Sequence, residues 1–333
     1  MAAPDPQPGP EPDTARGPEP DTARGPESDT ARGPEPGPES DTAPGPEPGP
    51  APEAPSVPPV SARHQPRFRS AERKEALAAA FQDQGEDYDR LRPGYPGAVI
   101  DAILTHLPDT DDDGTAAGTD GRARAVDLGA GTGKLAWALA ERGLDVTAVD
   151  TSAAMLETAR RRGPSAPSLA IHLAPAESTG LPTGMPHLVT AAQAWHWFDA
   201  PAATTEVARL LAPGGVLALV WNTLDVAIPW VHRLSRIMHA GDVQREDFEP
   251  AVGPELALIE REVHRWEDPM PSHDVIDLAR TRSYVITAAA ERRNRVLANL
   301  DWYLHEHLGH ARGSTIGVPY RTDLFLYRAV GPR

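Results

Sequence analysis

The residues best suited to chemistry lie in a glycine-rich segment. Glycines at 129, 131 and 133 follow an apolar run that contains Asp127, and a helix-like stretch begins after them. Glycines at such a strand–helix junction let the backbone turn sharply and let a ligand approach the helix N-terminus. The next apolar run ends at Asp150, whose carboxylate could accept hydrogen bonds from both hydroxyls of a ribose. Together the two features predict a site for a nucleoside-containing cofactor.

The spacing of the glycines narrows the choice of cofactor. A dinucleotide fingerprint reads G-x-G-x-x-G, whereas this chain has G-x-G-x-G with Lys134 in the position of the last glycine. A phosphate-binding P-loop needs Ser or Thr after its lysine, and here Leu135 follows. A ligand with an adenosine and an amino acid but no phosphate suits the segment, and Asp127 could reach its ammonium group. These properties are those of S-adenosylmethionine.

A parallel sheet must position these residues. Continuous apolar runs alternate with helix-like stretches, a pattern typical of parallel strands that helices bury on both faces. The expected strands are residues 123–128, 146–149, 169–173, 188–192 and 216–221, and the expected helices are residues 135–142, 153–162 and 202–211. In such sheets ligands bind beyond the carboxyl ends of the strands.

The pattern changes after residue 221. Helices are expected at 228–240, 275–282 and 288–308, and strands at 263–266 and 324–329. Helices added after a βα core suit an enzyme in which they cover a pocket. Trp137 and Trp302 are interpreted as core residues in preference to parts of an aromatic cage around a cation.

The first 62 residues differ from the rest of the chain. They hold 19 of the 37 prolines, no aromatic residue, and 12 acidic against 3 basic side chains, which accounts for −9 of the net charge of −16. The sequence GPEPDTAR stands at 9–16 and again at 17–24. Such a segment cannot bury enough apolar surface to offset its ordering entropy. Residues 1–62 are therefore predicted to form a disordered tail, and residues 63–333 a single folded domain.

Composition excludes several classes of protein. The chain has no cysteine, which excludes disulfide scaffolds, cysteine–zinc sites and thiol catalysis and fits a cytoplasmic location. Its net charge of −16 gives no general attraction to nucleic acid. It has no membrane-length apolar run and no secretory signal pattern at its start. The expected partner is a small-molecule substrate, and no membrane, nucleic acid or metal is expected to bind. The protein is expected to be a monomer or a homodimer.

Four segments resemble motifs of the class I S-adenosylmethionine-dependent methyltransferases. Residues 127–135 resemble motif I, and 148–152 resemble the second motif. Residues 176–182 are similar to the "AE-x-LP" loop near the adenine, and 210–215 to the "L-x-PGG" turn before the fifth strand. Further segments resemble the methyltransferase type 11 group, which includes trans-aconitate methyltransferase-like proteins. These segments are residues 88–96, 193–199, 218–222 and 319–323.

The resemblance spans about residues 81–328 and implies both a fold and an activity. The fold is α/β, a Rossmann-like seven-stranded methyltransferase sheet with helices on both faces, a late antiparallel strand and helical insertions late in the chain. The activity is transfer of a methyl group from S-adenosylmethionine to a small-molecule acceptor by in-line displacement, and a carboxylate is one such acceptor. Alignment of the reacting atoms at about 3–3.5 Å supplies much of the rate in such reactions.

The motifs also imply which residues contact the cofactor. Tyr88 and Arg92 would close over it, and Pro175 replaces the acid that many relatives direct at the adenine amine, which leaves the amide of Ala176 for that contact. The full set of expected cofactor contacts is Asp127, Gly129, Ala130, Gly131, Gly133, Asp150, Thr151, Ala176, Glu177, Gln193, Tyr88 and Arg92.

The acceptor side is less strongly marked in the sequence. His196 follows the fourth strand and is the candidate for acid–base catalysis, with a structural histidine as the alternative. Asn222, Trp197 and Arg282 are candidate substrate contacts, although for Arg282 exposed helix surface is the preferred interpretation. Two other functions stay open: a non-catalytic S-adenosylmethionine-binding or interaction protein that kept the fold, and an NAD-dependent oxidoreductase, which Lys134 disfavours.

Overall fold

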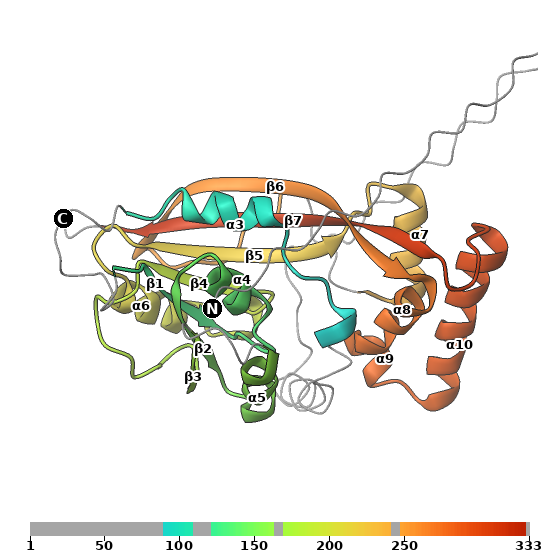
Figure 1. The fold of residues 1–333 in the computed structure, drawn as a ribbon, viewed down its shortest axis with the longest axis horizontal. Coiled ribbons are helices and arrows are strands. Elements are labelled where there is room, and N and C mark those ends of the chain that lie inside the picture. Colours follow the sequence, from blue (N-terminus) through green and yellow to red (C-terminus); the bar gives the residue numbers. More distant parts are fainter. Residues whose placement is uncertain (1–88, 109–120, 163–168, 241–246, 331–333) are drawn as a thin grey trace, which may run out of the picture. The chain divides into compact units, whose positions relative to one another are not determined.

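The computed structural model describes residues 89–108, 121–162, 169–240 and 247–330, and its elements carry the labels of Figure 1. The predicted tail at residues 1–62 lies outside this part of the chain. None of the described helices combines the length and the apolar character needed to cross a bilayer.

A seven-stranded mixed sheet forms the centre of the described residues. Its strand order is β3-β2-β1-β4-β5-β7-β6, in which the first five strands are parallel and β7 runs antiparallel to both of its neighbours. The strands are β1 (Arg124–Leu128), β2 (Asp145–Asp150), β3 (Leu169–Leu173), β4 (Leu188–Ala192), β5 (Val216–Leu224), β6 (Leu256–Pro271) and β7 (Thr315–Ala329). The strand order reverses between β1 and β4, which is where ligands bind in open sheets of this kind. The predicted Rossmann-like seven-stranded sheet with a late antiparallel strand is confirmed.

The two late strands are much longer than predicted. The runs at 263–266 and 324–329 are only parts of β6 and β7, which pair with each other from Leu256 to Pro271. β6 lies at the edge of the sheet and alternates exposed with half-buried residues, so it contains no long apolar run. β7 begins with Gly317 and Pro319, which are typical of turns, and this concealed its first half.

Helices cover both faces of the sheet because successive strand residues point to opposite sides. On one face, α3 (Gly97–Leu104) and α4 (Lys134–Glu141) pack on strand residues such as Val146, Val220 and Leu324. On the other face, α6 (Ala200–Leu210) packs on residues such as Leu219 and Phe325. α5 (Ala153–Arg162) contacts β2 and β3.

The remaining helices form a third apolar cluster. Figure 1 shows them together at the end of the sheet toward which β5 points. They are α7 (Pro229–Met238), α8 (Ser272–Asp277), the 3-10 turn Leu278–Thr281, α9 (Ser283–Ile286), α10 (Ala290–Trp302) and the π-helical turn Tyr303–His307. Leu224 from the end of β5 belongs to this cluster, which joins the helices to the sheet.

The two tryptophans assigned to the core have different surroundings. Trp137 is 6% exposed, and its indole nitrogen donates to the carbonyl oxygen of Ala159 at 2.7 Å, so this prediction is confirmed. Trp302 is 51% exposed and stacks on His307, so its assignment to the core was wrong. It lies on the last turn of α10, where the adjacent Tyr303 takes the buried position instead.

Close packing of α4 on α5 requires Gly133. Its φ is +78°, in the left-handed region, and a Cβ there would lie 2.8 Å from the Cβ of Ala159. A side chain at this position would meet both a backbone penalty and a steric clash.

We expect Gly133→Ala to lower the thermal stability of the unliganded protein more than Gly143→Ala. Both positions have left-handed backbones, which cost a non-glycine residue roughly 1–2 kcal/mol. Only Gly133 has a neighbour in contact, because nothing lies within 4 Å of a Cβ at Gly143. Repacking around Gly133→Ala should cost a further ~1–3 kcal/mol. Equal melting temperatures for the two variants would contradict this account of the α4–α5 contact.

Candidate functional site

A pocket of about 680 Å³ lies at the carboxyl ends of the parallel strands. The glycine turn after β1, Asp150 at the end of β2 and the turn after β4 contribute to its lining. Residues 92, 93 and 95 and residues 282 and 283 complete it from segments outside the parallel strands. The pocket therefore joins the predicted cofactor site to the helices added late in the chain.

The glycine turn is shaped to admit a ligand. Gly129 and Gly131 both have left-handed backbones, with φ of 66° and 56°. A Cβ at Gly129 would lie 2.6 Å from that of Ala194, whereas a Cβ at Gly131 would meet nothing within 4 Å. The backbone at Gly131 thus faces open space in the pocket, where a ligand can come close.

Asp150 both holds the turn and faces the pocket. Its Oδ2 accepts a hydrogen bond from the Gly131 amide at 2.9 Å, and its Oδ1 accepts one from the Ser152 amide at 2.8 Å. The helix cap of α5 is supplied by Ser152, whose hydroxyl accepts from the Met155 amide at 3.3 Å. Burial raises the pKa of Asp150, although these backbone bonds oppose the shift. A carboxylate has about four acceptor positions, so it can take further donors from a ligand.

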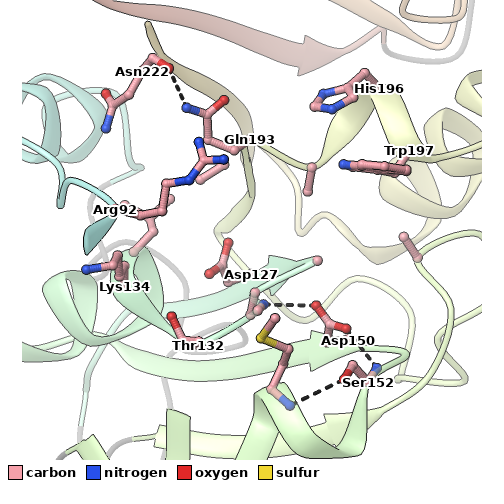
Figure 2. A pocket seen from close by; sticks show the side chains of 18 of the residues that line it. Arg92, Asp127, Thr132, Lys134, Asp150, Ser152, Gln193, His196, Trp197 and Asn222 are labelled. Atoms are coloured by element: carbon pink, nitrogen blue, oxygen red, sulfur yellow. Dashed lines mark hydrogen bonds between the residues drawn. The ribbon is translucent and has the colours of Figure 1, made fainter. Parts of the chain in front are cut away.

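Asp127 is a buried carboxylate beside the glycine turn. It is 1% exposed, and its Oδ1 accepts a hydrogen bond from the Thr190 hydroxyl at 2.7 Å. Burial, with a smaller contribution from the negative charge of Asp150, raises the pKa of Asp127 to about 7. Figure 2 shows it between the glycine turn and Arg92. A cationic ligand group here would stabilise its charged form.

The turn after β4 begins with a strained residue. Gln193 has a φ of 57°, which is uncommon outside glycine. Its amide donates to the Val220 carbonyl at 2.8 Å, and its side chain donates to the Asn222 carbonyl at 2.5 Å. These bonds hold an unfavourable backbone conformation in the pocket lining, as is typical of functional sites.

His196 and Trp197 lie side by side in the pocket lining, across from Arg92 and Lys134 (Figure 2). The turn that carries them is anchored by Trp195, which is 3% exposed and donates to the Ala251 carbonyl at 2.8 Å. Since Trp195 supplies the anchor, the placement of His196 on the pocket side favours contact with an acceptor. Its catalytic role stays a prediction.

Residues 89–95, here called the RP segment, cross the pocket from the glycine turn to the late helices. Asp89 accepts a hydrogen bond from the Thr132 hydroxyl at 2.7 Å and lies 3.8 Å from the Lys134 ammonium. Arg92 donates to the hydroxyl and the carbonyl of Thr281 at 3.0 and 2.8 Å. The RP segment therefore contacts both ends of the pocket, and Arg92 reaches the late helices as well as the lining.

Arg282 and Asn222 both line the pocket and are both predicted substrate contacts. Arg282 is 2% exposed, so its preferred interpretation as exposed helix surface was wrong. Asn222 is also buried, and its side-chain amide already bonds to Gly94 and Thr322. A substrate contact by either residue stays a prediction.

The pocket gathers most, though not all, of the predicted residues. Tyr88 lies outside the described residues, and Gly133 packs on α5 without lining the pocket. Several residues that line the pocket were not predicted from the sequence, among them Tyr95, Lys134, Met155, Ser283 and Tyr320. Lys134 could have been found, because it directly follows the glycines, whereas Ser283 and Tyr320 come from distant parts of the chain. Within the described residues, no three His, Asp or Glu side chains are grouped as metal ligands.

A Rossmann-like sheet with a glycine turn, an acid at the end of β2 and a pocket at the switch point defines an enzyme fold for nucleoside cofactors. Residues 126–219 match the family described as "Methyltransferase domain". The chain is 38% identical over 247 residues to an uncharacterized methyltransferase of Mycobacterium tuberculosis. The aligned region covers 74% of this chain and 94% of the relative. The chain belongs to the class I S-adenosylmethionine-dependent methyltransferases, and its cofactor is S-adenosylmethionine.

Two further comparisons agree with the family. A solved structure from Anaeromyxobacter dehalogenans, provisionally described as a type II methyltransferase, superposes with a TM-score of 0.54 at 27% identity, covering 71% of this chain and 96% of that one. The trans-aconitate 2-methyltransferase of Methylobacterium radiotolerans is 35% identical over 182 residues, which is 54% of this chain and 65% of the relative.

The residues present suit this cofactor. Asp150 offers carboxylate oxygens to the hydroxyls of a ribose, and Asp127 offers a negative charge to an ammonium group. The open space at Gly131 admits the ligand between them. The contacts of Asp150, Asp127 and Gly131 with the cofactor are inferred from the chemistry of these residues, and each contact stays a prediction.

We predict that Asp150→Ala weakens S-adenosylmethionine binding by more than about tenfold, because it removes acceptors for two ribose hydroxyls and releases the Gly131 amide. Asp145→Ala is the matched control, since Asp145 begins the same strand and pairs only loosely with Arg122 at 3.8 Å. Calorimetric titration of both variants measures the difference. An affinity for Asp150→Ala equal to that of the control would mean that the site is misplaced.

A second prediction concerns pH. The pKa of Asp127 is raised to about 7, so the free protein holds a proton there at lower pH and releases it as the pH rises. If the charged form binds the cofactor ammonium, affinity for S-adenosylmethionine should rise between pH 6 and 8 and then level off. Asp127→Asn should bind more weakly and lose this dependence. An unchanged pH profile in the variant would remove Asp127 from the binding account.

Proposed function

We propose that this methyltransferase acts on a small molecule that carries a carboxylate. The observation that supports this most strongly is the buried guanidinium of Arg282, which is 2% exposed and lines the cofactor pocket beside Ser283. Arg92 brings a second guanidinium to the same pocket. Because Arg92 already donates twice to Thr281 and is also a predicted cofactor contact, the preference for an anionic acceptor over a neutral one rests on Arg282.

The chemistry of arginine explains this preference. A guanidinium is charged at all physiological pH values and carries five N–H donors in a planar fork. That fork matches the two oxygens of a carboxylate and orients it as well as attracting it. In a buried site the attraction is screened less than at the surface. Arg282 can therefore set the position of an acceptor in the pocket.

The names of two relatives are consistent with this proposal. The relative in Methylobacterium radiotolerans is named for trans-aconitate, and one in Enterobacter lignolyticus is named a malonyl-[acyl-carrier protein] O-methyltransferase. Both names specify substrates built on carboxylic acids. The Enterobacter relative is 32% identical over 46% of this chain, so it supports the class of acceptor only.

The residues of this chain would contribute mainly by positioning. Bound S-adenosylmethionine supplies a methyl group on a positively charged sulfur, which is already an activated donor. Arg282 would hold the acceptor, and the RP segment and the turn after β4 would limit the access of water. A carboxylate nucleophile carries no proton to be removed, so it needs no general base. For a hydroxyl or amine acceptor, His196 would be the candidate to take a proton, because it lines the pocket.

We predict that the protein methylates one or more small carboxylic acids, trans-aconitate being the first to try, with the products identified by mass spectrometry. Arg282→Lys should raise KM for that acid about tenfold or more, because lysine keeps the charge but loses the bidentate fork. Its affinity for S-adenosylmethionine should change less than about twofold.

Arg280→Lys is the control for this experiment. Arg280 lies two residues away, is exposed and pairs with Asp277, so its replacement should leave KM unchanged. Preferential methylation of uncharged acceptors by the wild-type chain, or equal KM values for the two variants, would contradict the proposed acceptor class.

A further inference from the structure

Three polar side chains stand in a row on the sheet face that carries α3 and α4. They are Asn222 on β5, Thr322 directly opposite it on β7, and Trp266 on β6, which lies diagonally to Thr322 and pairs with Tyr320; the three are here called the relay. The strand residues before Asn222 and after Thr322 on this face, Val220 and Leu324, belong to the apolar core. Asn222 is 3% exposed and Thr322 is fully buried. Polar groups at this depth must satisfy one another.

Hydrogen bonds run through the relay in one direction. The indole nitrogen of Trp266 donates to the Thr322 hydroxyl at 2.8 Å. The Thr322 hydroxyl donates to Oδ1 of Asn222 at 2.6 Å. Nδ2 of Asn222 then donates to the carbonyl oxygen of Gly94 at 2.7 Å. A bond network thus spans three neighbouring strands and ends on the backbone of the RP segment.

The chemistry of its two ends determines this direction. An indole N–H can only donate and a backbone carbonyl can only accept. The Thr322 oxygen accepts from Trp266, so its hydrogen points to Asn222, which must then present its oxygen to Thr322 and its NH₂ group to Gly94. The reverse orientation of the Asn222 amide would place two oxygens against each other at Gly94 and leave buried groups unsatisfied. The relay therefore selects one orientation of Asn222.

The Gly94 contact affects the pocket. Gly94 lies between Arg92 and Tyr95, both of which line the pocket, whereas neither Thr322 nor Trp266 does. The backbone carbonyl of Asn222 also accepts from the side chain of Gln193, a neighbouring residue of the pocket lining (Figure 2). A change at Thr322 would reach the ligand only through Asn222 and the RP segment.

We propose that Thr322 is a positioning residue, which fixes the orientation of Asn222 and thereby holds the RP segment over the cofactor pocket. This inference rests on the proposed function, since it assigns the relay to the S-adenosylmethionine pocket. It gives Asn222 the task of supporting the RP segment and not that of recognising the acceptor. Trp266 supports Thr322 by fixing the rotation of its hydroxyl.

The test compares three variants of the full chain by calorimetric titration with S-adenosylmethionine. Thr322→Val removes the hydroxyl at nearly constant volume and should weaken binding about tenfold, the loss expected from one broken buried bond. Thr322→Ser restores the hydroxyl and should bind within about twofold of the wild type. Thr223→Val is the matched control, because Thr223 is a buried threonine on β5 whose hydroxyl donates to the Arg321 carbonyl, outside the relay.

Hydrogen exchange measured by mass spectrometry gives a second readout that does not need the cofactor. Thr322→Val should speed exchange in peptides that contain residues 92–96, with little change in residues 145–150 of β2. If Thr322→Val fails to fold, Trp266→Phe replaces it and should speed exchange in the same peptide. Faster exchange confined to the RP segment supports the proposal, whereas unchanged exchange overturns it.

The affinities separate this inference from the proposed function. Wild-type affinity in Thr322→Val, or an equal loss in Thr223→Val, would overturn the positioning role. Absence of binding by the wild-type chain would contradict the cofactor assignment on which the proposed function depends, and the exchange measurement would then decide on the relay alone.

Discussion

The hydrogen bond from the Gly131 amide to Asp150 is the contact on which the rest of the site depends. It joins the ends of β1 and β2, and so fixes the glycine turn at the point where the strand order of the sheet reverses. The same carboxylate is left with acceptor positions facing the pocket, so one side chain shapes the turn and offers oxygens to the ligand. Burial of Asp150 and Asp127 raises the pKa of both carboxyl groups, and a ligand with donors and a positive charge would offset that cost.

The pocket divides by charge into two regions. Asp127 and Asp150 line the pocket beside the glycine turn, where we predict contacts to a cation and to hydroxyl groups. Arg92 and Arg282 lie in the lining supplied by the RP segment and the late helices, where an anion would be recognised. The RP segment contacts the first region through Asp89 and the second through Arg92. A segment that contacts both regions can couple the binding of cofactor and acceptor, and in our proposal the relay maintains its position.

Much of the cofactor region was predictable from the sequence, and much less of the acceptor region. The strands β1, β4 and β5 are buried along nearly their whole length, so they are continuous apolar runs; the glycines follow directly after β1, and Asp150 ends the neighbouring β2. β6 could not be delimited, because an edge strand alternates exposed and half-buried residues. The bond between Arg92 and Thr281 joins residues 189 positions apart, and no local pattern reports such a contact. The support that Thr322 gives to Asn222 depends likewise on the register between β5 and β7.

Binding of the cofactor by the unmodified chain tests the central claim most directly. The purified protein would be titrated calorimetrically with S-adenosylmethionine and, separately, with NAD. The glycine spacing, Asp150 and the family predict micromolar binding of S-adenosylmethionine and no measurable binding of NAD. Binding of NAD in its place, or of neither compound, would contradict the assignment of this pocket to a methyl donor.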